Sequence, residues 1–518
     1  MLKENNIRKG FITPAPFIKL RDAMPEHLRP LMTFLYFTGC SVGGRASHHV
    51  VPSRLKPRDL PRLETMRMSA YSQDRRDFLR VALAAGSHCF TPRFAWALGS
   101  EEERAAWYCN AKFGMFIHWG PYSLASVEAS WPIMTPTVGG ITEAEYRELP
   151  KRFNPTKFNP HAFIDLARAA GQQYMVFTTK HHDGFCMFDT SYTDYKITNT
   201  PYGKDIVKEL ADACKERGMP LGFYYSPPDM HHPAFRDTSK LAKENWGGEP
   251  ARPEWPLYLD YMQLQLTELL TAYGPVALIW FDGLHHQEKY GGIRFLDLIH
   301  RLQPATLVND RIGLPGDYQT PEQFIPNGIP TKDVRFNAVD TSVQEKLKSA
   351  IPKPGDFQLW ETCMTINNTW AYNSHDHQYK SAQKLIRSLV EVASRGGNFL
   401  LNVGPPPDGV IQPEFQERLR TIGSWLSVNG ESIYGTTYGP VQGVSSIRTT
   451  AKKDKIFVHV FDWPRGPLEI AGFQGRALSA YLVAGGQPLK MQESDGKLRI
   501  ELPSQPPDPS VSVIALRV

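Results

Sequence analysis

The sequence predicts an α/β protein, a (β/α)8 TIM-like barrel followed by a small C-terminal antiparallel β-sandwich domain. Two observations lead to this prediction. From about residue 107 to about residue 436, short apolar runs alternate with amphipathic helical stretches. Beyond that point, strand-like segments alternate apolar and polar residues between Gly, Pro and Asp. We therefore expect a barrel over residues 98–436 and a sandwich over residues 437–518.

The barrel strands are predicted from runs that are apolar on both faces, as the strands of a buried parallel sheet are. These runs are 112–120, 173–184, 220–226, 276–283, 306–311, 358–364 and 398–405. The helix over 162–171 illustrates the intervening segments, with Phe163, Ile164 and Leu166 at helical spacing and Gly171 as its stop. Further helices are predicted over 205–218, 258–274, 293–304 and 380–397. About eight such units fit a closed barrel, and a doubly wound open sheet is the alternative.

The sandwich strands are predicted over 455–463, 476–483, 498–502 and 510–518. A small domain of this kind either binds sugar or caps the barrel. We favour capping, because the packing of a sheet against a barrel needs no ligand.

Charge is distributed unevenly along the chain. The net charge is +5, yet residues 1–97 carry 16 Lys and Arg against 7 Asp and Glu, while the remainder carries 42 against 46. The body is thus mildly acidic, and its charge gives no case for nucleic acid binding. The six cysteines have no spacing typical of a zinc site or a disulfide framework. No apolar run approaches the roughly 18 residues that predict a membrane span.

The leader contains a segment that resembles a twin-arginine export signal. Arg75 and Arg76 precede Phe78 and Leu79, and a short apolar stretch and a small-x-small cleavage candidate at 95–97 follow. We expect residues 66–97 to be a signal peptide and the protein to be exported, periplasmic or extracellular. A basic amphipathic helix is the alternative.

An export signal should lie at the N-terminus, so Met66 and Met68 are candidate true starts. Residues 22–45 resemble a fragment of a phage-type tyrosine recombinase, although they lack its catalytic arrangement of Arg followed by Gly-Glu. We expect residues 1–65 to be a start assigned too far upstream or a fused remnant, disordered and without activity.

Polar side chains stand where the predicted barrel strands end, and these ends form the active face of a parallel barrel. Asp282 ends an apolar strand and is followed by Gly283, which leaves room beside it. Other strands end on polar residues in the same way: His118, the pair His181 and His182, Tyr224, and Arg311 after Asn309 and Asp310. Each alone could be structural, but five such ends together predict one convergent site.

Two chemistries suit these residues. Metal-assisted hydrolysis would use His and Asp at strand ends. Adjacent residues of a strand point to opposite faces, however, so His181 and His182 are poorly placed to hold one ion, although His285 and His286 follow in a loop. We therefore predict no metal and no other cofactor.

The second chemistry is glycoside hydrolysis with retention, which needs a carboxylate nucleophile and a carboxylic acid about 5–5.5 Å away. Asp282 is the natural nucleophile. The acid must come from a nearby loop, where Glu322 is the first candidate and Glu361 the second. Its pKa would have to be raised for this role.

These residues together resemble glycoside hydrolase family 29, the α-L-fucosidases. The resemblance runs in the family's order through WYCNAKFGMFIHWGPYS, YMVFTTKHHDGFCMFDTSYTDY, LGFYYSP, LIWFDG, VNDRIG, TPEQ, WETCMTINNTWAYN and GGNFLLNVGPPPDG. It covers the whole predicted barrel, and the combination of motifs is highly specific.

The resemblance implies a retaining α-L-fucosidase that acts on a fucosylated oligosaccharide or glycoconjugate. It makes Asp282 the nucleophile and Glu322, in the matching TPE loop, the acid/base. The side chains expected to bind fucose hydroxyls and the nucleophile are His118, His181, His182, Tyr224 and Arg311. Trp280 and Trp370 are expected to pack on apolar faces of the sugar, with Trp370 near the C6 methyl. The pattern resembles the branch of the family with broad aglycone tolerance.

One loop departs from the family's pattern. Many relatives have Glu-Trp after the first strand, where the Glu contacts the sugar, but here Ser130 precedes Trp131 and Glu128 is the nearest carboxylate. Glu128 is a candidate substitute for that contact, and Trp131 is expected to bind substrate as in the family. Because of this departure, a non-catalytic fucose-binding protein is an alternative function, and a metal-dependent barrel hydrolase is a further one. The sequence leaves the linkage cleaved and the oligomeric state open.

Overall fold

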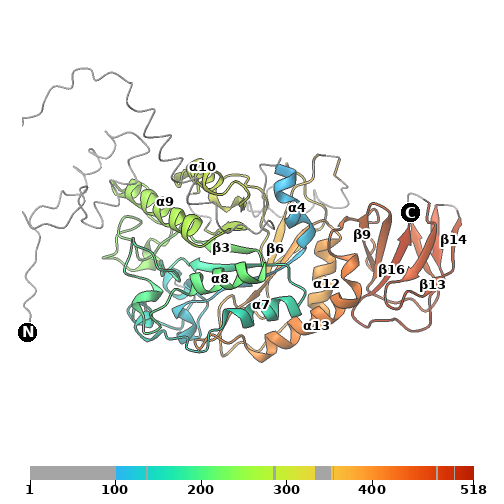
Figure 1. Ribbon diagram of the computed structural model, residues 1–518, viewed down its shortest axis with the longest axis horizontal. Coiled ribbons are helices and arrows are strands. Elements are labelled where there is room, and N and C mark those ends of the chain that lie inside the picture. The colour runs from blue at the N-terminus through green and yellow to red at the C-terminus, as the bar shows by residue number, and fades with distance from the viewer. Residues whose placement is uncertain are drawn as a thin grey trace, which may run out of the picture.

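The computed structural model describes residues 101–518, apart from 136–137, 284–286, 333–351, 354, 474–475 and 495. These residues form a larger α/β body and a smaller all-β body beside it (Figure 1). The predictions for residues 1–97, including the export signal, and for His285 and His286 lie outside the described residues.

The α/β body is built on a seven-stranded parallel sheet in the order β5-β4-β3-β2-β1-β7-β6. Its strands are β1 (Phe113–Ile117), β2 (Tyr174–Lys180), β3 (Leu221–Tyr225), β4 (Leu278–Phe281), β5 (Leu307–Val308), β6 (Glu361–Thr365) and β7 (Asn398–Val403). Every residue of these strands is buried, as their continuous apolar runs predict. Each of the seven predicted runs contains one strand.

An irregular extended segment, residues 317–323, joins the two edges of this sheet. Isolated parallel bridges pair Tyr318 with Asn309 beyond β5, and Gln319 and Glu322 with Trp360 and Cys363 at β6. Backbone hydrogen bonds reinforce both sides, from the Asp317 amide to the Val308 carbonyl and between residues 319 and 361. The strands therefore form a closed ring, and the predicted barrel is confirmed over the open sheet.

Helices cover the outside of the ring (Figure 1). The α-helices are α4 (Glu101–Ala111), α5 (Trp131–Met134), α6 (Glu143–Glu148), α7 (Pro160–Ala169), α8 (Ile206–Arg217), α9 (Trp255–Ala272), α10 (Gly292–Leu302), α12 (Ala382–Ala393) and α13 (Pro413–Asn429). The five predicted helices correspond to α7, α8, α9, α10 and α12. Short 3-10 helices are η2 (Pro121–Ala125), η3 (Leu149–Arg152), η4 (Ile197–Asn199), η5 (Ala242–Glu244), η6 (Gln287–Lys289), η7 (Asp310–Ile312) and η8 (Gly430–Ser432).

Local sequence signals set where these helices begin and end. Asn159 caps α7, since its side chain accepts the His161 and Ala162 amides, and Pro160 occupies the first helical position. Asp205 caps α8 in the same manner, and Gly218 ends it with a φ of 65°, a conformation that favours glycine.

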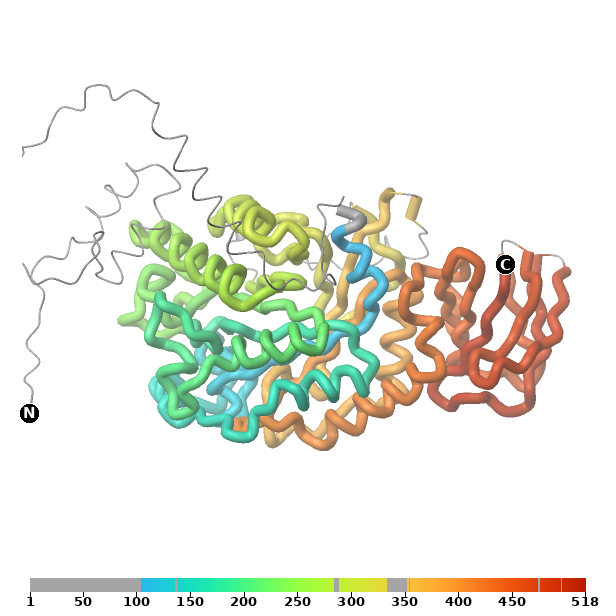
Figure 2. Tube along the Cα trace, in the orientation of Figure 1, coloured from blue at the N-terminus to red at the C-terminus, as the bar shows by residue number. Residues whose placement is uncertain are grey.

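The smaller body, at the red end of the trace in Figure 2, contains two antiparallel sheets. One has the order β13-β12-β16-β10-β9-β8 and the other β11-β15-β14. The strands are β8 (Thr437–Tyr438), β9 (Ile447–Lys452), β10 (Lys455–Val460), β11 (Leu468–Ala471), β12 (Ser479–Leu482), β13 (Pro488–Leu489), β14 (Met491–Ser494), β15 (Lys497–Ile500) and β16 (Ser512–Arg517). Residues such as Ile470 and Leu498 of the small sheet share one core with Val458 and Ile514 of the large one, so the predicted sandwich is confirmed.

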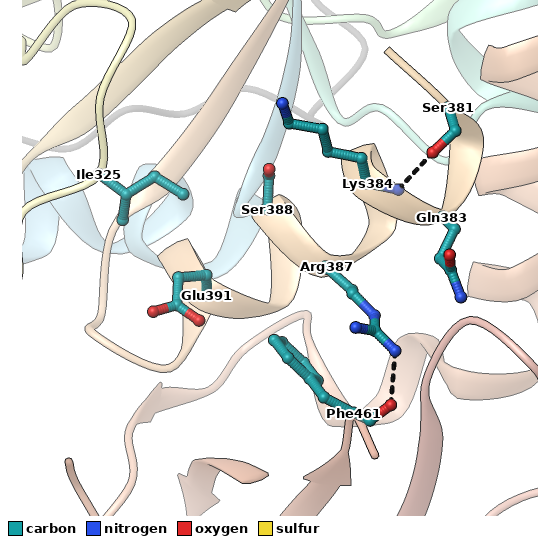
Figure 3. A pocket seen from close by; sticks show the side chains of 8 residues that line it. All are labelled: Ile325, Ser381, Gln383, Lys384, Arg387, Ser388, Glu391 and Phe461. Carbon is teal, nitrogen blue, oxygen red and sulfur yellow. Dashed lines mark hydrogen bonds between the residues drawn. The ribbon is translucent and has the colours of Figure 1, made fainter. Parts of the chain in front are cut away.

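The sandwich is fastened to α12 and α13 of the barrel. Arg387 of α12 donates to the carbonyls of Phe461 and Ser510, and Trp425 of α13 donates to the Val511 carbonyl. A groove of about 380 Å³ lies at this junction (Figure 3). It is lined by Ile325, Ser381, Gln383, Lys384, Arg387, Ser388, Glu391 and Phe461. Two charged residues of the groove join the two bodies: Arg387 through these carbonyls, and Glu391 through its ion pair with Arg448.

No helix among the described residues is long and apolar enough to cross a membrane.

Candidate active site

A pocket of about 270 Å³ opens at the carboxyl ends of the barrel strands. Its size is at the lower end of ligand sites, which are roughly 300–1,000 Å³ for drug-sized molecules, and suits a single sugar ring. The candidates Tyr224, Glu128 and Glu361 do not line it, whereas all the other substrate-binding and catalytic candidates do. The lining residues are Phe116, His118, Trp131, Met134, His181, His182, Pro228, Trp246, Trp280, Asp282, Gly283, Arg311, Glu322, Cys363 and Trp370. None of them belongs to the sandwich.

Asp282 directly follows β4, and the glycine after it allows the chain to turn there. Gly283 has a φ of 118°, and a Cβ at this position would lie 2.4 Å from Cδ of Pro228. The Gly283 amide also donates to Asp282 Oδ1 at 2.9 Å. A buried apolar strand can therefore deliver a carboxylate into the pocket, where the Asp282 side chain is 19% exposed.

Three side chains from other strands surround the Asp282 carboxylate. Tyr224 at the end of β3 donates its hydroxyl to Oδ2 at 2.8 Å, and Arg311 of η7 donates to Oδ1 at 2.8 Å. His182 Nε2 lies 3.5 Å from Oδ2. Burial acts to raise the pKa of Asp282, but the Arg311 charge and His182 outweigh it and lower the pKa below its ordinary value. The carboxylate is thus ionised at neutral pH, as a nucleophile must be.

The same nitrogen of Arg311 also holds the second carboxylate. Nη1 donates to Glu322 Oε2 at 2.9 Å, while Nε and Nη2 donate to the hydroxyl and carbonyl of Thr320. The guanidinium lies over the Trp280 ring, 4.5 Å from its centroid. Two oxygens bound to one nitrogen can be no more than roughly 6 Å apart. This bound agrees with the carboxylate spacing of retaining glycosidases, about 5–5.5 Å, and is shorter than the 6.5–9.5 Å of inverting ones.

Three buried histidines line the pocket, and each has its Nδ1 engaged. The partners of Nδ1 are Asn402 Oδ1 for His118 at 2.7 Å, Ser130 Oγ for His181 at 2.6 Å and Ser226 Oγ for His182 at 2.6 Å. Burial lowers the pKa of all three, that of His118 to about 4. They are therefore neutral at pH 7, and each has one ring nitrogen left, which for His182 lies 3.5 Å from Asp282 Oδ2.

The expectation that His181 and His182 face opposite ways is wrong. Both line the pocket, with ring centroids 4.3 Å apart. Strand β2 ends at Lys180, and its register with β3 already shifts between Thr178 and Lys180, so the strand alternation no longer applies to the two histidines.

Aromatic rings supply the apolar part of the pocket. Trp370 packs against Phe116 and His118, with centroid distances of 6.1 and 5.1 Å, and Trp280 stacks on Tyr224. On the other side, Trp131 lies edge-on to His182 and to Trp246. Glycosidases commonly use such rings against the apolar faces of a sugar.

Glu361, the second acid candidate, lies beneath this site rather than in it. It occupies the first position of β6, is fully buried and does not line the pocket. Its carboxylate accepts hydrogen bonds from Trp280 Nε1 at 3.0 Å and from the Tyr174 hydroxyl. Burial raises its pKa to about 7. Glu361 therefore holds Trp280 in place, without access to a sugar.

The loop that departs from the family's pattern uses both of its polar residues on neighbouring groups. Ser130 is buried and binds His181, besides accepting the Asp183 amide at 3.1 Å. Glu128 accepts the Trp370 amide with both oxygens, at 2.8 and 3.1 Å. Both polar groups of this loop are thus engaged with neighbouring protein groups. Burial raises the pKa of Glu128 to about 7.

The structure adds lining residues that sequence reasoning missed, namely Phe116, Met134, Pro228, Trp246 and Cys363. Phe116 and Cys363 lie within motifs already singled out, but their type gave no sign of a role. Trp246 comes from the long connection between β3 and α9, where the sequence offers no pattern. Among the described residues, no group of three or more His, Cys, Asp or Glu side chains could hold a metal ion.

Comparison with known proteins points to one family. A family model described as alpha-L-fucosidase matches residues 82–431. An alpha-L-fucosidase of Branchiostoma floridae is 30% identical over 416 residues, which cover 74% of this chain and 86% of that protein.

Solved structures agree with the sequence comparison. Alpha-L-fucosidase isoenzyme 1 from Paenibacillus thiaminolyticus has a TM-score of 0.69 at 34% identity, over 80% of this chain and 99% of that chain. A family 29 alpha-L-fucosidase from Bacteroides thetaiotaomicron, solved as a trapped covalent intermediate with 2-fluoro-fucosyl fluoride, has a TM-score of 0.67 at 26% identity, over 80% and 95%.

Proposed function

Because this chain belongs to the α-L-fucosidase family, glycoside hydrolase family 29, we propose that it removes terminal α-L-fucosyl residues from glycans by double displacement, with Asp282 as nucleophile and Glu322 as acid/base. The observation that carries the assignment is the single Arg311 nitrogen that binds both carboxylates. No other glutamate among the described residues lines the pocket with Asp282.

In the first step, an Asp282 oxygen attacks the anomeric carbon of the fucosyl residue while the bond to the leaving oxygen breaks. Glu322 gives its proton to that oxygen, so the aglycone departs as an alcohol. In the second step, Glu322 takes a proton from water, the resulting hydroxide equivalent attacks the anomeric carbon, and Asp282 leaves as a carboxylate. Fucose is released with its original anomeric configuration.

The environments of the two carboxyl groups support these roles. Asp282 is largely enclosed and has a lowered pKa, which keeps the nucleophile charged. The Glu322 side chain is 41% exposed, which gives a leaving group and an incoming water access to it. The covalent intermediate trapped in the Bacteroides thetaiotaomicron relative is the species expected in such a mechanism.

The rest of the pocket suits the two chemical sides of fucose. Neutral histidine nitrogens offer partners to the sugar hydroxyls, while the Tyr224 hydroxyl holds the nucleophile. The Phe116 and Trp370 rings form an apolar wall for the C6 methyl, and a wall of this kind contributes about 1–3 kcal/mol to discrimination.

The test compares wild type with Asp282→Asn and Glu322→Gln on an aryl α-L-fucoside, with Glu361→Gln as a matched control. We expect D282N to lose at least about 10³-fold in kcat. E322Q should lose far more on a fucoside with a poor leaving group than on an activated one, and azide should rescue it. Undiminished turnover by D282N would refute the nucleophile, and fucose binding without turnover in wild type would establish the non-catalytic alternative.

Stereochemistry is a separate readout of the mechanism. Proton NMR during hydrolysis should detect the α anomer of fucose first, whereas inversion would give the β anomer. A chelator should leave the activity unchanged, and loss of activity with chelator would support the metal-dependent alternative.

We further infer that the protein is exported through residues 66–97. Support comes from the sequence alone, through Arg75 and Arg76 and the small-x-small cleavage site at 95–97. N-terminal sequencing of protein recovered outside the cytoplasm should begin near residue 98. Recovery of uncleaved protein in the cytoplasm, unchanged when both arginines are replaced by lysine, would contradict export.

A further inference from the structure

Asn402 stands behind the pocket, on β7, without lining it. Its side chain is 1% exposed. In the parallel pairing of β7 with β1, Asn402 lies opposite Phe116. Phe116 precedes His118 by two residues along the chain. It belongs to the segment NFLLNVGP, whose motif the proposed chemistry leaves without a role.

The Asn402 amide is bound at both of its ends. Nδ2 donates to the backbone carbonyl of Trp370 at 2.7 Å, and Oδ1 faces His118 Nδ1 at 2.7 Å. A carbonyl oxygen only accepts hydrogen bonds, so the amide nitrogen must face Trp370 and the amide oxygen must face His118. His118 Nδ1 therefore carries the proton that Oδ1 accepts.

This contact sets what His118 offers the sugar. Burial keeps the imidazole neutral, since it lowers the pKa of His118 to about 4. With the proton on Nδ1, the pocket-side Nε2 is an acceptor and takes a hydrogen bond from a sugar hydroxyl. The titratable groups that face His118 from other elements are His181, His182, Tyr224, Asp282 and Arg311.

The second contact fixes the Trp370 wall. The Trp370 peptide is bound on one side by Glu128, which accepts its amide, and on the other by Asn402, which donates to its carbonyl. Gly404, two residues after Asn402, lets this loop come close, because a Cβ there would lie 2.6 Å from the Ala371 carbonyl carbon and 2.7 Å from the Trp370 oxygen. Residues 402–404 (NVG) thus pack directly against the loop that carries Trp370 and hold it in place.

We propose that Asn402 is a positioning residue that sets two sides of the fucose pocket at once, the acceptor nitrogen of His118 and the place of the Trp370 wall. The inference rests on the proposed function, because it assumes that both residues contact fucose. It predicts that Asn402 governs the preference for a C6 methyl over a hydroxymethyl group. Removing an orienting partner of this kind typically costs 10–100-fold in activity.

The test measures kcat/KM on an aryl α-L-fucoside and on the aryl α-L-galactoside, in which the C6 methyl becomes hydroxymethyl. Asn402→Ala should lower kcat/KM for the fucoside by roughly 10–100-fold and reduce the fucoside-to-galactoside ratio at least about fivefold. The matched control is Asn398→Ala. Asn398 lies at the start of the same strand, is equally buried and also donates to a backbone carbonyl, that of Tyr108 at 2.8 Å, but does not contact the pocket. The fucoside-to-galactoside ratio of N398A should equal that of wild type.

Asn402→Asp keeps the shape of the side chain, so it tests the role of Asn402 even if N402A does not fold. Its carboxylate cannot donate to Trp370 and favours the protonated imidazole, so Nε2 becomes a donor at low pH. We expect the acid limb of kcat/KM to move up by about one pH unit or more in N402D, and not in N398A.

Suppose that the wild type is active. If N402A then has the fucoside-to-galactoside ratio of wild type, or if N402D has the same acid limb of kcat/KM as wild type, this inference is overturned and the proposed function stays intact. A wild type that hydrolyses neither glycoside would remove both.

Discussion

Replacing Glu361 by Gln should make the protein more stable at alkaline pH and leave its activity nearly intact. Glu361 is fully buried beneath Trp280, and burial raises its pKa from an ordinary 4.5 to about 7. Gln keeps an oxygen for Trp280 Nε1, and its amide can donate to the Tyr174 oxygen. The substitution therefore removes the titration without removing the packing.

The magnitude follows from the two pKa values. Below about pH 4.5 the carboxyl is protonated in both folded and unfolded chains, so its contribution to stability is fully present. Between pH 4.5 and 7 the unfolded chain loses its proton while the folded chain keeps it, so the free energy of unfolding falls as pH rises. The interval corresponds to about 3 kcal/mol in total at about 1.4 kcal/mol per pH unit. E361Q should match wild type near pH 4.5 and exceed it by up to this amount above pH 8.

Thermal unfolding of both proteins from pH 4.5 to 9 provides the measurement. A gain of about 3 kcal/mol should appear as roughly 3–6 °C in Tm for a body of this size. The half-buried Glu128, whose pKa is also raised to about 7, titrates in the same window but is present in both proteins, so it cancels in the difference. Glu469→Gln, at an exposed position of β11, controls for the loss of one charge.

A Tm difference that does not change with pH would refute the reasoning on burial. A loss of activity near 10³-fold in E361Q would instead make Glu361 the acid/base, against the proposed role of Glu322.

Two further substitutions test charged groups around the site. Arg311→Lys should lower kcat on an aryl fucoside by roughly 10²-fold, because an ammonium cannot hold two carboxylates and Thr320 together; activity within threefold of wild type would contradict this. Lys180→Met should cost about 3–5 kcal/mol in thermal unfolding, since it leaves Asp229 buried without its partner. The exposed Lys208→Met serves as its control, and an equal Tm for the two would show that the buried pair contributes nothing.

Much of the fold follows from the period of the apolar residues. Each run that is apolar on both faces forms a buried strand, and the helices predicted over 162–171 and 205–218 correspond to α7 and α8. The stretch at 317–323 could not be predicted as part of the ring, because it pairs through single bridges and carries the polar residues Asp317, Gln319 and Glu322. Its neighbours, rather than its own sequence, hold it extended.

Site residues could be predicted from the sequence where the direction of a strand alone places the side chain. They were harder to predict where one side chain is positioned by another. Strand ends identified Asp282 and Tyr224. The alternation rule failed for His181 and His182, because the strand had already ended. Asn402 was hidden, since nothing in an apolar strand reveals that one amide binds both an imidazole and the peptide of a loop distant in sequence.

The two carboxylates proposed as catalytic differ in how the fold holds them, and this explains why they were not equally evident in the sequence. Asp282 is placed by a regular strand and a glycine, both readable in the sequence. Glu322 lies on the irregular segment, next to Gln323 with a φ of 60°, and is fixed by Arg311, which Thr320 anchors in turn. Arg311, which meets both groups, is then the residue that keeps their separation suited to retention, and this is the physical reason to expect R311K to impair chemistry more than binding.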